Sequence, residues 1–409
     1  ALRRVVLEAA RRLQDNFPYP HPLYVGQMLK PPHPAASLAY ALAMCINPNN
    51  HALDGGRASS RMEKEAVADI AGMLGWTEHL GHLCGGGTMA NLEALWIARE
   101  LAPGRTVLAS DQAHYTHERL SGVLAVPFRT VATDARGRMD PAALARELAQ
   151  GDVGTVVVTL GTTALGAVDP LDALLPMCRE HGVRVHVDAA YGGFFALAEN
   201  LEDDAARAFD AASEADSYVV DPHKHGLQPY GCGCVLFRDP AVGAVYRHDS
   251  PYTYFTSDEL HLGEISLECS RPGAAAVALW TTNRLLPYDR EGAFAHSLEA
   301  CRRGALALRE RLASDPRFRP IVDPQLDIVV WAVEAADPAA SSDAARRLFA
   351  AAAEHDLHLA LVTLPPHVAG TDEPLTCLRA CVMKPEHEDW LEPILERLDA
   401  GAAAIGLEA

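Results

Sequence analysis

Two stretches decide the fold of this chain: VGTVVVTLGTT, residues 153–163, and VRVHVDAAYGG, residues 183–193. Each stretch opens with a short run of apolar, mostly β-branched residues and closes with small or polar ones. Residues 170–181, between the two runs, have the spacing of apolar residues that is typical of a helix. A strand, a helix and a second strand in this order predict parallel strands covered by helices on both faces.

The same alternation continues on both sides of this unit. Further strands are expected at TVLAS (106–110), SYVV (217–220) and CGCVLF (232–237), and further helices at 88–101 and 140–150. The chain is therefore predicted to have an α/β fold with a mostly parallel sheet. After about residue 290 the pattern becomes that of a smaller α+β domain: helix 291–313, strand 326–333, helix 341–355, strands 357–363 and 376–383, and a last helix from 386.

Length and pattern together predict three parts. The 409 residues are too many for one small core, and we expect a helical N-terminal segment (1–50), a large domain (51–290) and a small C-terminal α+β domain (291–409). The first residues, ALRRVVLEAARRLQDNF, have the pattern of an amphipathic helix. Their apolar runs are too short for a signal peptide.

Composition narrows the class of partner. Apolar residues make up 49% of the chain and charged residues 22%, as in ordinary globular proteins, and no apolar run is long enough to cross a membrane. The net charge of −19 disfavours nucleic acid and anionic membranes, so we expect a small-molecule ligand. The nine cysteines are scattered and contain no CxxC pair, which indicates reduced thiols in a cytoplasmic protein.

Ligands of α/β sheets bind beyond the carboxyl ends of the strands, so the residues after each predicted strand are the first candidates. Asp188 follows VRVHV; a buried carboxylate there needs a partner, either a protonated heterocycle nitrogen or an ordinary cap or ion pair. Thr162 and Thr163 follow the preceding strand, as hydroxyl donors or as a polar turn. His114 and His117 follow TVLAS, but no further ligand with zinc spacing accompanies them, so no metal is expected.

The glycine cluster CGGGTMANLEALWIARE (84–100) runs directly into a predicted helix. Free backbone amides and a helix N-terminus in this arrangement favour a phosphate. The alternative is a dinucleotide fingerprint, GxGxxA, with Gly85, Gly87, Ala90 and Asp111. Two features disfavour it: the preceding segment, EHLGHL, is a poor buried strand, and the acidic residue lies too far along the chain.

One lysine is conspicuous in DPHKHGLQPYGCG, residues 221–233. Of the 35 basic residues only four are lysines, and Lys224 is placed directly after a predicted strand. Lysine, unlike arginine, can lose its proton and act as a nucleophile, although a surface turn could carry such a residue by chance. A phosphate cradle, a histidine, a threonine pair, an aspartate and a lysine, each after a strand, are the set that pyridoxal 5′-phosphate (PLP) requires.

This ordered set resembles the PLP-dependent group II amino-acid decarboxylases. The resemblance runs from HPLYVGQM (21–28) to LRACVM (378–383), and its most specific pieces are ASDQAHYTHER (109–119), VHVDAAYGG (185–193) and DPHKHG (221–226). It implies the fold-type-I architecture: a mostly parallel seven-stranded sheet flanked by helices, with the smaller α+β domain at the C-terminus. Family members commonly run longer at the N-terminus, where extra helices interlock a homodimer with shared active sites.

The resemblance also implies roles for single residues. Lys224 binds the cofactor covalently, Asp188 pairs with the pyridine nitrogen and His114 stacks on the ring. The remaining cofactor contacts are expected from Gly86, Gly87, Thr88, Thr162, Ala190, His223 and Ser270, the last of them acting across the dimer. Gln27 and Arg379 would hold the substrate, and Tyr252 or Tyr254, with Tyr252 preferred, would protonate the α-carbon.

The activity that the resemblance implies is decarboxylation of an L-amino acid to an amine and CO2. GLQPYGCG after Lys224 is closer to archaeal decarboxylases and to lyases of the superfamily than to the animal enzymes. Decarboxylation-coupled oxidative deamination and carbon–carbon lyase chemistry are therefore the alternatives on the same cofactor. An NAD-dependent enzyme and a non-catalytic binding protein are the alternatives outside it, and the sequence leaves open whether the substrate is acidic or aromatic.

Overall fold

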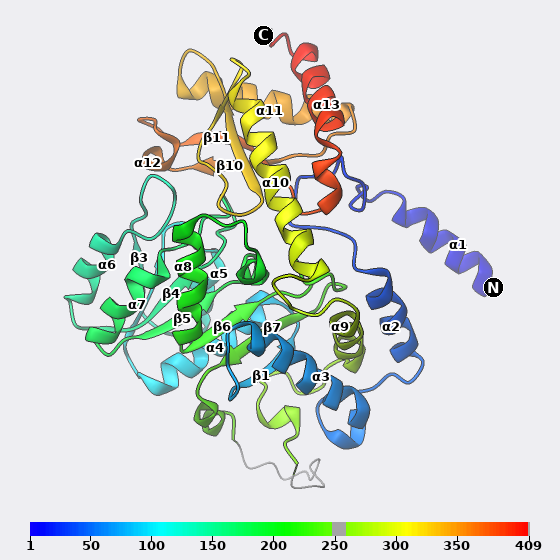
Figure 1. Cartoon of the computed structure of the whole chain (residues 1–409), viewed down its shortest axis with the longest axis vertical. Helices are drawn as coiled ribbons and strands as arrows, with labels where there is room; N and C mark the ends of the chain where they lie inside the picture. The colour runs from blue at the N-terminus through cyan, green and yellow to red at the C-terminus, as the bar shows by residue number, and fades with distance from the viewer. Residues whose placement is uncertain (248–258, 408–409) are drawn as a thin grey trace.

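The computed structural model describes residues 1–247 and 259–407, and its centre is a seven-stranded sheet (Figure 1). The strands are β1 (Leu80–Cys84), β2 (Thr106–Ser110), β3 (Phe128–Val131), β4 (Val153–Thr159), β5 (Arg184–Asp188), β6 (Ser217–Val220) and β7 (Gly233–Phe237). Their order is β1-β7-β6-β5-β4-β2-β3. Neighbours from β3 to β6 are parallel, whereas β7 is antiparallel to both β6 and β1. The predicted α/β class and mostly parallel sheet are confirmed.

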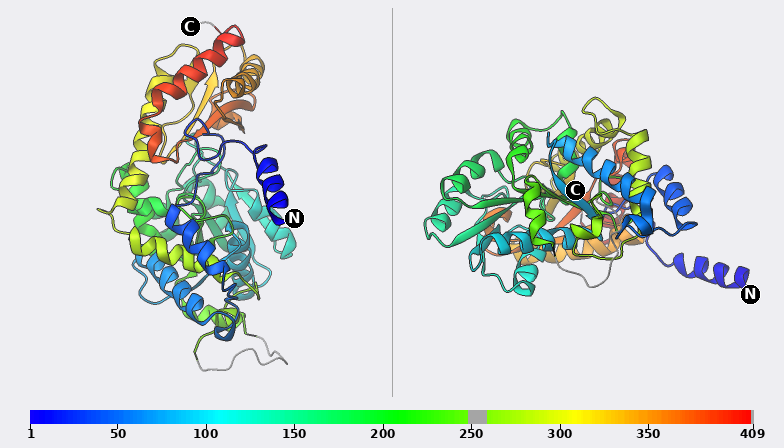
Figure 2. Two further views of the ribbon diagram at one scale, coloured as in Figure 1. Left: turned by 90° about the vertical axis from the view of Figure 1, so that its right-hand side faces the viewer. Right: turned by 90° about the horizontal axis from the view of Figure 1, so that it is seen from below.

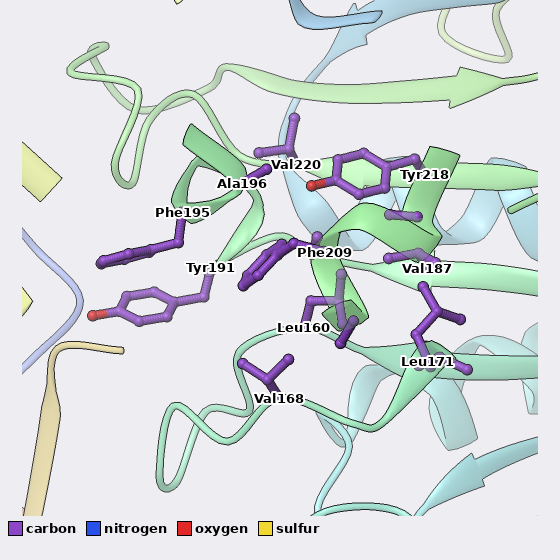
Figure 3. Packing of buried hydrophobic residues seen from close by; sticks show 14 of the residues in the cluster. Leu160, Val168, Leu171, Val187, Tyr191, Phe195, Ala196, Phe209, Tyr218 and Val220 are labelled. Atoms are coloured by element: carbon purple, nitrogen blue, oxygen red, sulfur yellow. The ribbon is translucent and has the colours of Figure 1, made fainter. Parts of the chain in front are cut away.

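Helices cover both faces of this sheet because its central strands are apolar on both sides. In β4, Val156 and Val158 join the main core, while Val157 packs on the other face with Leu95 and Leu120. Figure 3 shows part of the main core, with Leu160, Leu171 and Val187 packed together beside the strands. The helices of this part are α3 (Leu53–Met73), α4 (Gly87–Leu101), α5 (Thr116–Val123), α6 (Pro141–Leu148), α7 (Leu171–Glu180), α8 (Asp203–Ala211) and α9 (Gly273–Leu285), with short 3-10 turns at Gly193–Leu197, Ala212–Glu214, Pro240–Val245 and Leu262–Glu264.

A second, antiparallel sheet of four strands lies at the C-terminal end of the molecule (Figure 1). Its order is β10-β11-β9-β8, with β8 (Phe318–Pro320), β9 (Ile328–Val333), β10 (Ala360–Leu364) and β11 (Leu375–Cys381). The accompanying helices are α10 (Ala293–Ala313), α11 (Pro338–Glu354), α12 (Pro366–Ala369) and α13 (Leu391–Ala404), with a 3-10 turn at Pro385–Glu388. Helix α11 begins where Pro338 takes the first helical position and the Asp337 side chain accepts from the Ala340 amide at 2.8 Å.

The N-terminal residues form α1 (Leu2–Leu13) and α2 (Pro34–Met44). Helix α2 packs against α9, but α1 projects from the body in Figure 1 and in the right-hand view of Figure 2 and has no buried residue. Its apolar side chains Leu2, Val5, Val6 and Leu13 are exposed. In the described part of the chain, no helix combines the length and apolarity needed to span a bilayer.

The sequence interpretation of EHLGHL as a poor buried strand is wrong, because the segment contains β1. His82 in its middle is fully buried, and its Nε2 lies 2.9 Å from Glu93 Oε2 on α4. Gly81 is needed for packing against β7, since a Cβ there would lie 2.5 Å from Leu236 Cδ2. A hydrogen-bonded histidine and a glycine both interrupt the apolar residues of this segment, so a pattern based on apolar residues does not indicate the strand.

Candidate active site

A cavity of about 520 Å³ opens where the parallel strands end and α4 begins. Its lining comes from the segments after β2, β4, β5 and β6, as expected for the carboxyl edge of a parallel sheet. From the predicted set it collects Gly86, Gly87, Thr88, His114, Asp188, Ala190, His223 and Lys224. Eight of the predicted residues, far apart in the sequence, therefore surround one space.

Lys224 lies in the turn that follows β6. Its amide donates to the Asp221 carbonyl at 2.9 Å, and its Nζ lies 3.0 Å from Asp221 Oδ2. The lysine side chain is 22% exposed and the Asp221 side chain is buried, and both residues line the cavity. Within the described part of the chain Asp221 Oδ1 has no hydrogen-bond partner, which leaves an acceptor at the cavity.

Asp188 ends β5 with its carboxylate fixed on two sides. Oδ2 lies 2.8 Å from His117 Nε2, and Oδ1 accepts from the Ala190 amide at 3.1 Å. Burial acts to raise the pKa of Asp188, but the hydrogen bond and charge of His117, the charge of Lys224 and the Ala190 amide outweigh it and hold the pKa below its usual range. The site therefore presents a carboxylate that stays ionised at neutral pH.

His114 lines the cavity between Asp188 and Lys224. Burial lowers the pKa of His114, and the positive charge of Lys224 adds to that effect, although Asp188 opposes it. The Thr116 amide donates to His114 Nδ1 at 3.3 Å, and this hydrogen bond fixes the orientation of the imidazole ring. A neutral, oriented imidazole is suited to lie flat against a planar ligand.

The first turn of α4 forms a cradle at one end of the cavity. Gly86 caps the helix with φ of 141°, a conformation that favours glycine, and a Cβ on it would lie 3.0 Å from His223 Cε1. A Cβ on Gly87 would lie 2.8 Å from Asp221 Oδ2. The first amides of a helix have no partner within the helix, so this turn, which begins with two glycines, suits an anion such as a phosphate.

His223 closes the cradle from the other side. Its Nδ1 donates to the Cys232 carbonyl at 2.8 Å, so its Nε2 is the atom left for other contacts. That atom lies 3.6 Å from Asp221 Oδ2, and the ring stands 4.7 Å from the ring of Tyr230. Burial lowers the pKa of His223, although the charge of Asp221 opposes this.

Several predicted residues do not line the cavity. Thr162 is buried and its Oγ1 accepts from the Ala167 amide at 3.0 Å, so it stabilises a turn, and its neighbour Thr163 lines the cavity instead. Ser270 is exposed and accepts from Asn49 Nδ2 at 3.1 Å. Gln27 is exposed, and Arg379 is buried with one hydrogen bond, from Nη1 to the Gly26 carbonyl at 3.3 Å. Tyr252 and Tyr254 lie outside the described residues.

Residues of the site that were not assigned a role from the sequence include Asp221, His117, Tyr230 and Glu268. Asp221 stands in the same motif as Lys224, and a carboxylate three residues before that lysine was the available signal. His117 was considered only as a zinc ligand beside His114. The structure separates the two, because His114 faces the cavity and His117 faces Asp188 from behind.

Comparison with known proteins agrees with this site. Residues 32–334 match the model of the family described as "Pyridoxal-dependent decarboxylase conserved domain". The chain is 32% identical to a probable L-aspartate decarboxylase of Halobacterium salinarum, over 75% of this chain and 81% of the relative. It is 29% identical to a probable L-tyrosine/L-aspartate decarboxylase of Methanothermobacter thermautotrophicus, over 84% and 92%.

Solved structures show the same fold. The rice (Oryza sativa) protein TDC, solved with PLP and tryptamine, superposes with a TM-score of 0.82 at 20% identity, over 93% of this chain and 84% of that one. Mouse CSAD superposes with a TM-score of 0.81 at 24% identity over the same shares. Fold, cavity and comparisons together define a PLP-dependent enzyme. The chain belongs to the pyridoxal-dependent decarboxylase family, and its reaction is the decarboxylation of an L-amino acid.

The residues present fit PLP. A Cβ on Gly86 or Gly87 would lie very close to neighbouring atoms. With glycine at both positions, the backbone amides of this turn are open to an anion such as a phosphate. Asp188 supplies the ionised carboxylate that a protonated pyridine nitrogen needs, and Lys224 supplies an amine within the same cavity.

Proposed function

We propose that Lys224, Asp188 and His114 form the centre at which this decarboxylase removes the carboxylate of an L-amino acid as CO2 and releases the amine. The observation that carries this assignment is the convergence of the three side chains on one cavity from three different strand ends. Bound PLP supplies an electron sink for the bond that breaks.

Each residue has a task that follows from its surroundings. Asp221, 3.0 Å from Nζ, holds the Lys224 amine toward the cavity and can receive or return its proton. Asp188 keeps its negative charge because His117 and the Ala190 amide stabilise it, so it can hold a proton on the facing nitrogen of the ligand. His114 would cover one face of the cofactor ring, and the first turn of α4 with His223 would hold its phosphate, since all of them line the cavity.

Arg379 is the candidate for the substrate carboxylate. Its side chain is buried, and within the described residues neither Nε nor Nη2 has a hydrogen-bond partner, so the guanidinium keeps donors for a ligand near Tyr191. Arginine is the residue best suited to grip a carboxylate with two hydrogen bonds. Gln27, which is exposed and follows Gly26, the residue whose carbonyl accepts from Arg379 Nη1, is proposed to contact the rest of the substrate.

The substrate is proposed to be one of the amino acids named for the relatives, tyrosine or aspartate. The test is CO2 release from each L-amino acid by the PLP-loaded protein, with amine, aldehyde and peroxide measured in parallel. Amine in equal amount to CO2 is the expected product. Aldehyde with peroxide from the unmutated enzyme would instead establish the oxidative alternative.

We further propose a homodimer with shared active sites. Helix α1 supports this, because its apolar face, with Leu2, Val5, Val6 and Leu13, lies on solvent in the single chain. Ser270, exposed and away from its own cavity, is free to contribute to the site of a second copy. Sedimentation should give a dimer, and Val6→Glu should weaken it whereas Arg4→Glu, on the side of α1 opposite Leu2 and Val6, should not. A fully active monomer would contradict the proposal.

A cytoplasmic location completes the proposal. All nine cysteines are free, and seven of them are buried in the core. A compartment that keeps thiols reduced fits this state best.

A further inference from the structure

One buried carboxylate joins the four-stranded sheet to the active site. Asp327 directly precedes β9 and is fully buried. Its Oδ1 accepts from the Tyr191 hydroxyl at 2.6 Å, and its Oδ2 lies 3.1 Å from His225 Nε2, a close electrostatic contact that is not aligned as a hydrogen bond. Both partners belong to the seven-stranded part of the molecule.

The two partners are the immediate neighbours of the catalytic segments. His225 directly follows Lys224, and Tyr191 is three residues beyond Asp188 and itself lines the cavity. Asp327 therefore touches both chain segments that leave β5 and β6, one carrying the proposed cofactor lysine and the other the proposed ring carboxylate. No other carboxylate in the described residues is shown in contact with both segments.

The aromatic rings around His225 restrict the orientation of its imidazole. The Tyr191 and Phe195 rings lie 4.9 Å and 5.1 Å from the His225 ring, so the imidazole is held edge-on between them. Figure 3 shows Tyr191 and Phe195 extending side by side, away from Val187 and Leu171. Within the described residues neither ring nitrogen of the buried His225 has an aligned hydrogen bond, so the close contact with Asp327 is the polar contact that sets the orientation of the imidazole.

Asp327 keeps its charge in this setting. Burial acts to raise its pKa, but His225, the Tyr191 hydroxyl and the charge of Lys30 together hold the pKa below the usual range. Lys30, from the N-terminal segment, is also buried and donates to the Met383 carbonyl at 3.2 Å. Burying a charge is costly unless it is paired, so three parts of the chain must assemble for this carboxylate to be accommodated.

We propose that Asp327 is a positioning residue, which holds Tyr191 and His225 so that the Asp188 and Lys224 segments stay in register with the cofactor. The proposal rests on the assignment of Lys224 and Asp188 made above. It predicts that removing the charge of Asp327 impairs chemistry at Lys224 although the two side chains do not touch.

The test is Asp327→Asn, which keeps the shape of the side chain and removes its charge. When PLP is added to the cofactor-free variant, the visible absorbance band of lysine-bound PLP should form at least about tenfold more slowly than in the unmutated protein. We expect kcat to fall at least about tenfold with KM changed less than about threefold, the pattern of a lost positioning contact. Tyr191→Phe, which removes one arm, should show a smaller change in the same direction.

Tyr218→Phe is the matched control. Tyr218 is also a buried tyrosine with one hydrogen bond, to the Gly193 carbonyl at 3.1 Å, but that bond does not involve Asp327. It should leave band formation and kcat within about twofold while lowering the unfolding midpoint as Tyr191→Phe does. In the double variant Tyr191→Phe/Asp327→Asn, the loss should be smaller than the product of the single losses.

Two results would overturn the proposal: band formation and kcat within about twofold of the unmutated protein in Asp327→Asn, or equal effects of Tyr191→Phe and Tyr218→Phe. If Asp327→Asn does not fold, the two tyrosine variants decide alone. Failure of the proposed function looks different, since the unmutated protein would then form no band with PLP, or Lys224→Ala would still form it.

Discussion

At the scale of single residues, Asp188 is defined by what stabilises its charge. His117 lies 2.8 Å from one oxygen and the Ala190 amide 3.1 Å from the other, and together with the charge of Lys224 they more than offset its burial. A carboxylate whose pKa is lowered in the folded protein contributes stability above its ordinary pKa and loses it only as the pH falls through the lower, folded-state pKa. Titration of Asp188 should therefore not contribute to any change in activity between about pH 5 and pH 8.

Asp188→Asn should still fold and bind PLP but should lower kcat by at least about a hundredfold, because a buried charge contact is worth roughly 3 kcal/mol or more. The measurement is kcat with saturating PLP, alongside the affinity for PLP. Asp111→Asn is the control, since Asp111 is an exposed aspartate that follows β2 outside the cavity. Unmutated rates in Asp188→Asn would mean that the ring nitrogen lies elsewhere.

The sequence predicted well which types of residue lie at the site. It predicted less well which of two adjacent residues has its side chain in the cavity. Asp188, His114 and Lys224 were found because each follows a strand whose apolar run is unmistakable. Thr162 and Thr163 follow such a strand equally, and only the positive φ of 105° at Gly161 and the tight turn behind it decide that Thr163 faces the cavity. The pairing of His117 with Asp188 joins residues 71 positions apart and leaves no local signal.

At the scale of elements, α4 begins with two glycines, Gly86 as its cap and Gly87 as its first residue, at positions where a Cβ would meet neighbouring atoms. Gly87→Ala should weaken PLP binding at least about tenfold, because the new Cβ would lie 2.8 Å from Asp221 Oδ2 and 3.2 Å from Ala190 Cβ in the cradle itself. Titration of the cofactor-free protein with PLP measures the effect.

The matched control is Gly122→Ala in α5, where a Cβ would meet nothing within 4 Å. That change should leave PLP binding unaltered and stabilise the protein by up to about 1 kcal/mol, because alanine is the better helix former. Equal PLP affinity in Gly87→Ala and the unmutated protein would place the phosphate away from α4.

Elements with strong patterns were predicted closely, and elements held by side-chain partners were not. The expected strands 106–110 and 217–220 are β2 and β6 without any shift, and the helix expected at 88–101 is α4 with one more residue. Strand β1 was missed because His82 is made compatible with burial by Glu93, a partner on another element. A strand cannot be predicted from the pattern of its own residues when the contact that allows a polar residue to be buried comes from another element.

At the scale of the whole molecule, the N-terminal segment and the end of β11 meet around buried lysines. Lys384 is 2% exposed, and its Nζ donates to the Tyr24 carbonyl at 2.6 Å. Burial lowers the pKa of Lys384 from its ordinary 10.5 to about 8. Between these two values the unfolded chain holds a proton that the folded protein has lost, so the free energy of unfolding should rise with pH across that window.

Lys384→Met should lose this dependence. Relative to the variant, the unmutated protein should gain on the order of 1–3 kcal/mol between pH 8 and pH 10.5, as measured by unfolding midpoints at several pH values. Parallel curves for the two proteins would show that the Lys384 amine is protonated in the folded state throughout.

The arrangement of the parts was less predictable than the parts themselves. The alternation of strands and helices predicts a parallel sheet, but it does not indicate that β7 runs antiparallel to both of its neighbours, β6 and β1. The bridge from Asp327 to Tyr191 joins residues 136 positions apart. The division at residues 50 and 290 stays a prediction, as does the homodimer.

The central claim is that Lys224 is the residue that binds PLP, and direct chemical identification tests it best. The PLP-loaded protein is treated with borohydride, which makes the lysine–cofactor bond permanent, and is then digested and analysed by mass spectrometry. The cofactor is expected on the peptide that contains Lys224, and Lys224→Ala should carry no label and show no turnover. Label on Lys30, Lys64 or Lys384, or normal turnover in Lys224→Ala, would contradict the account.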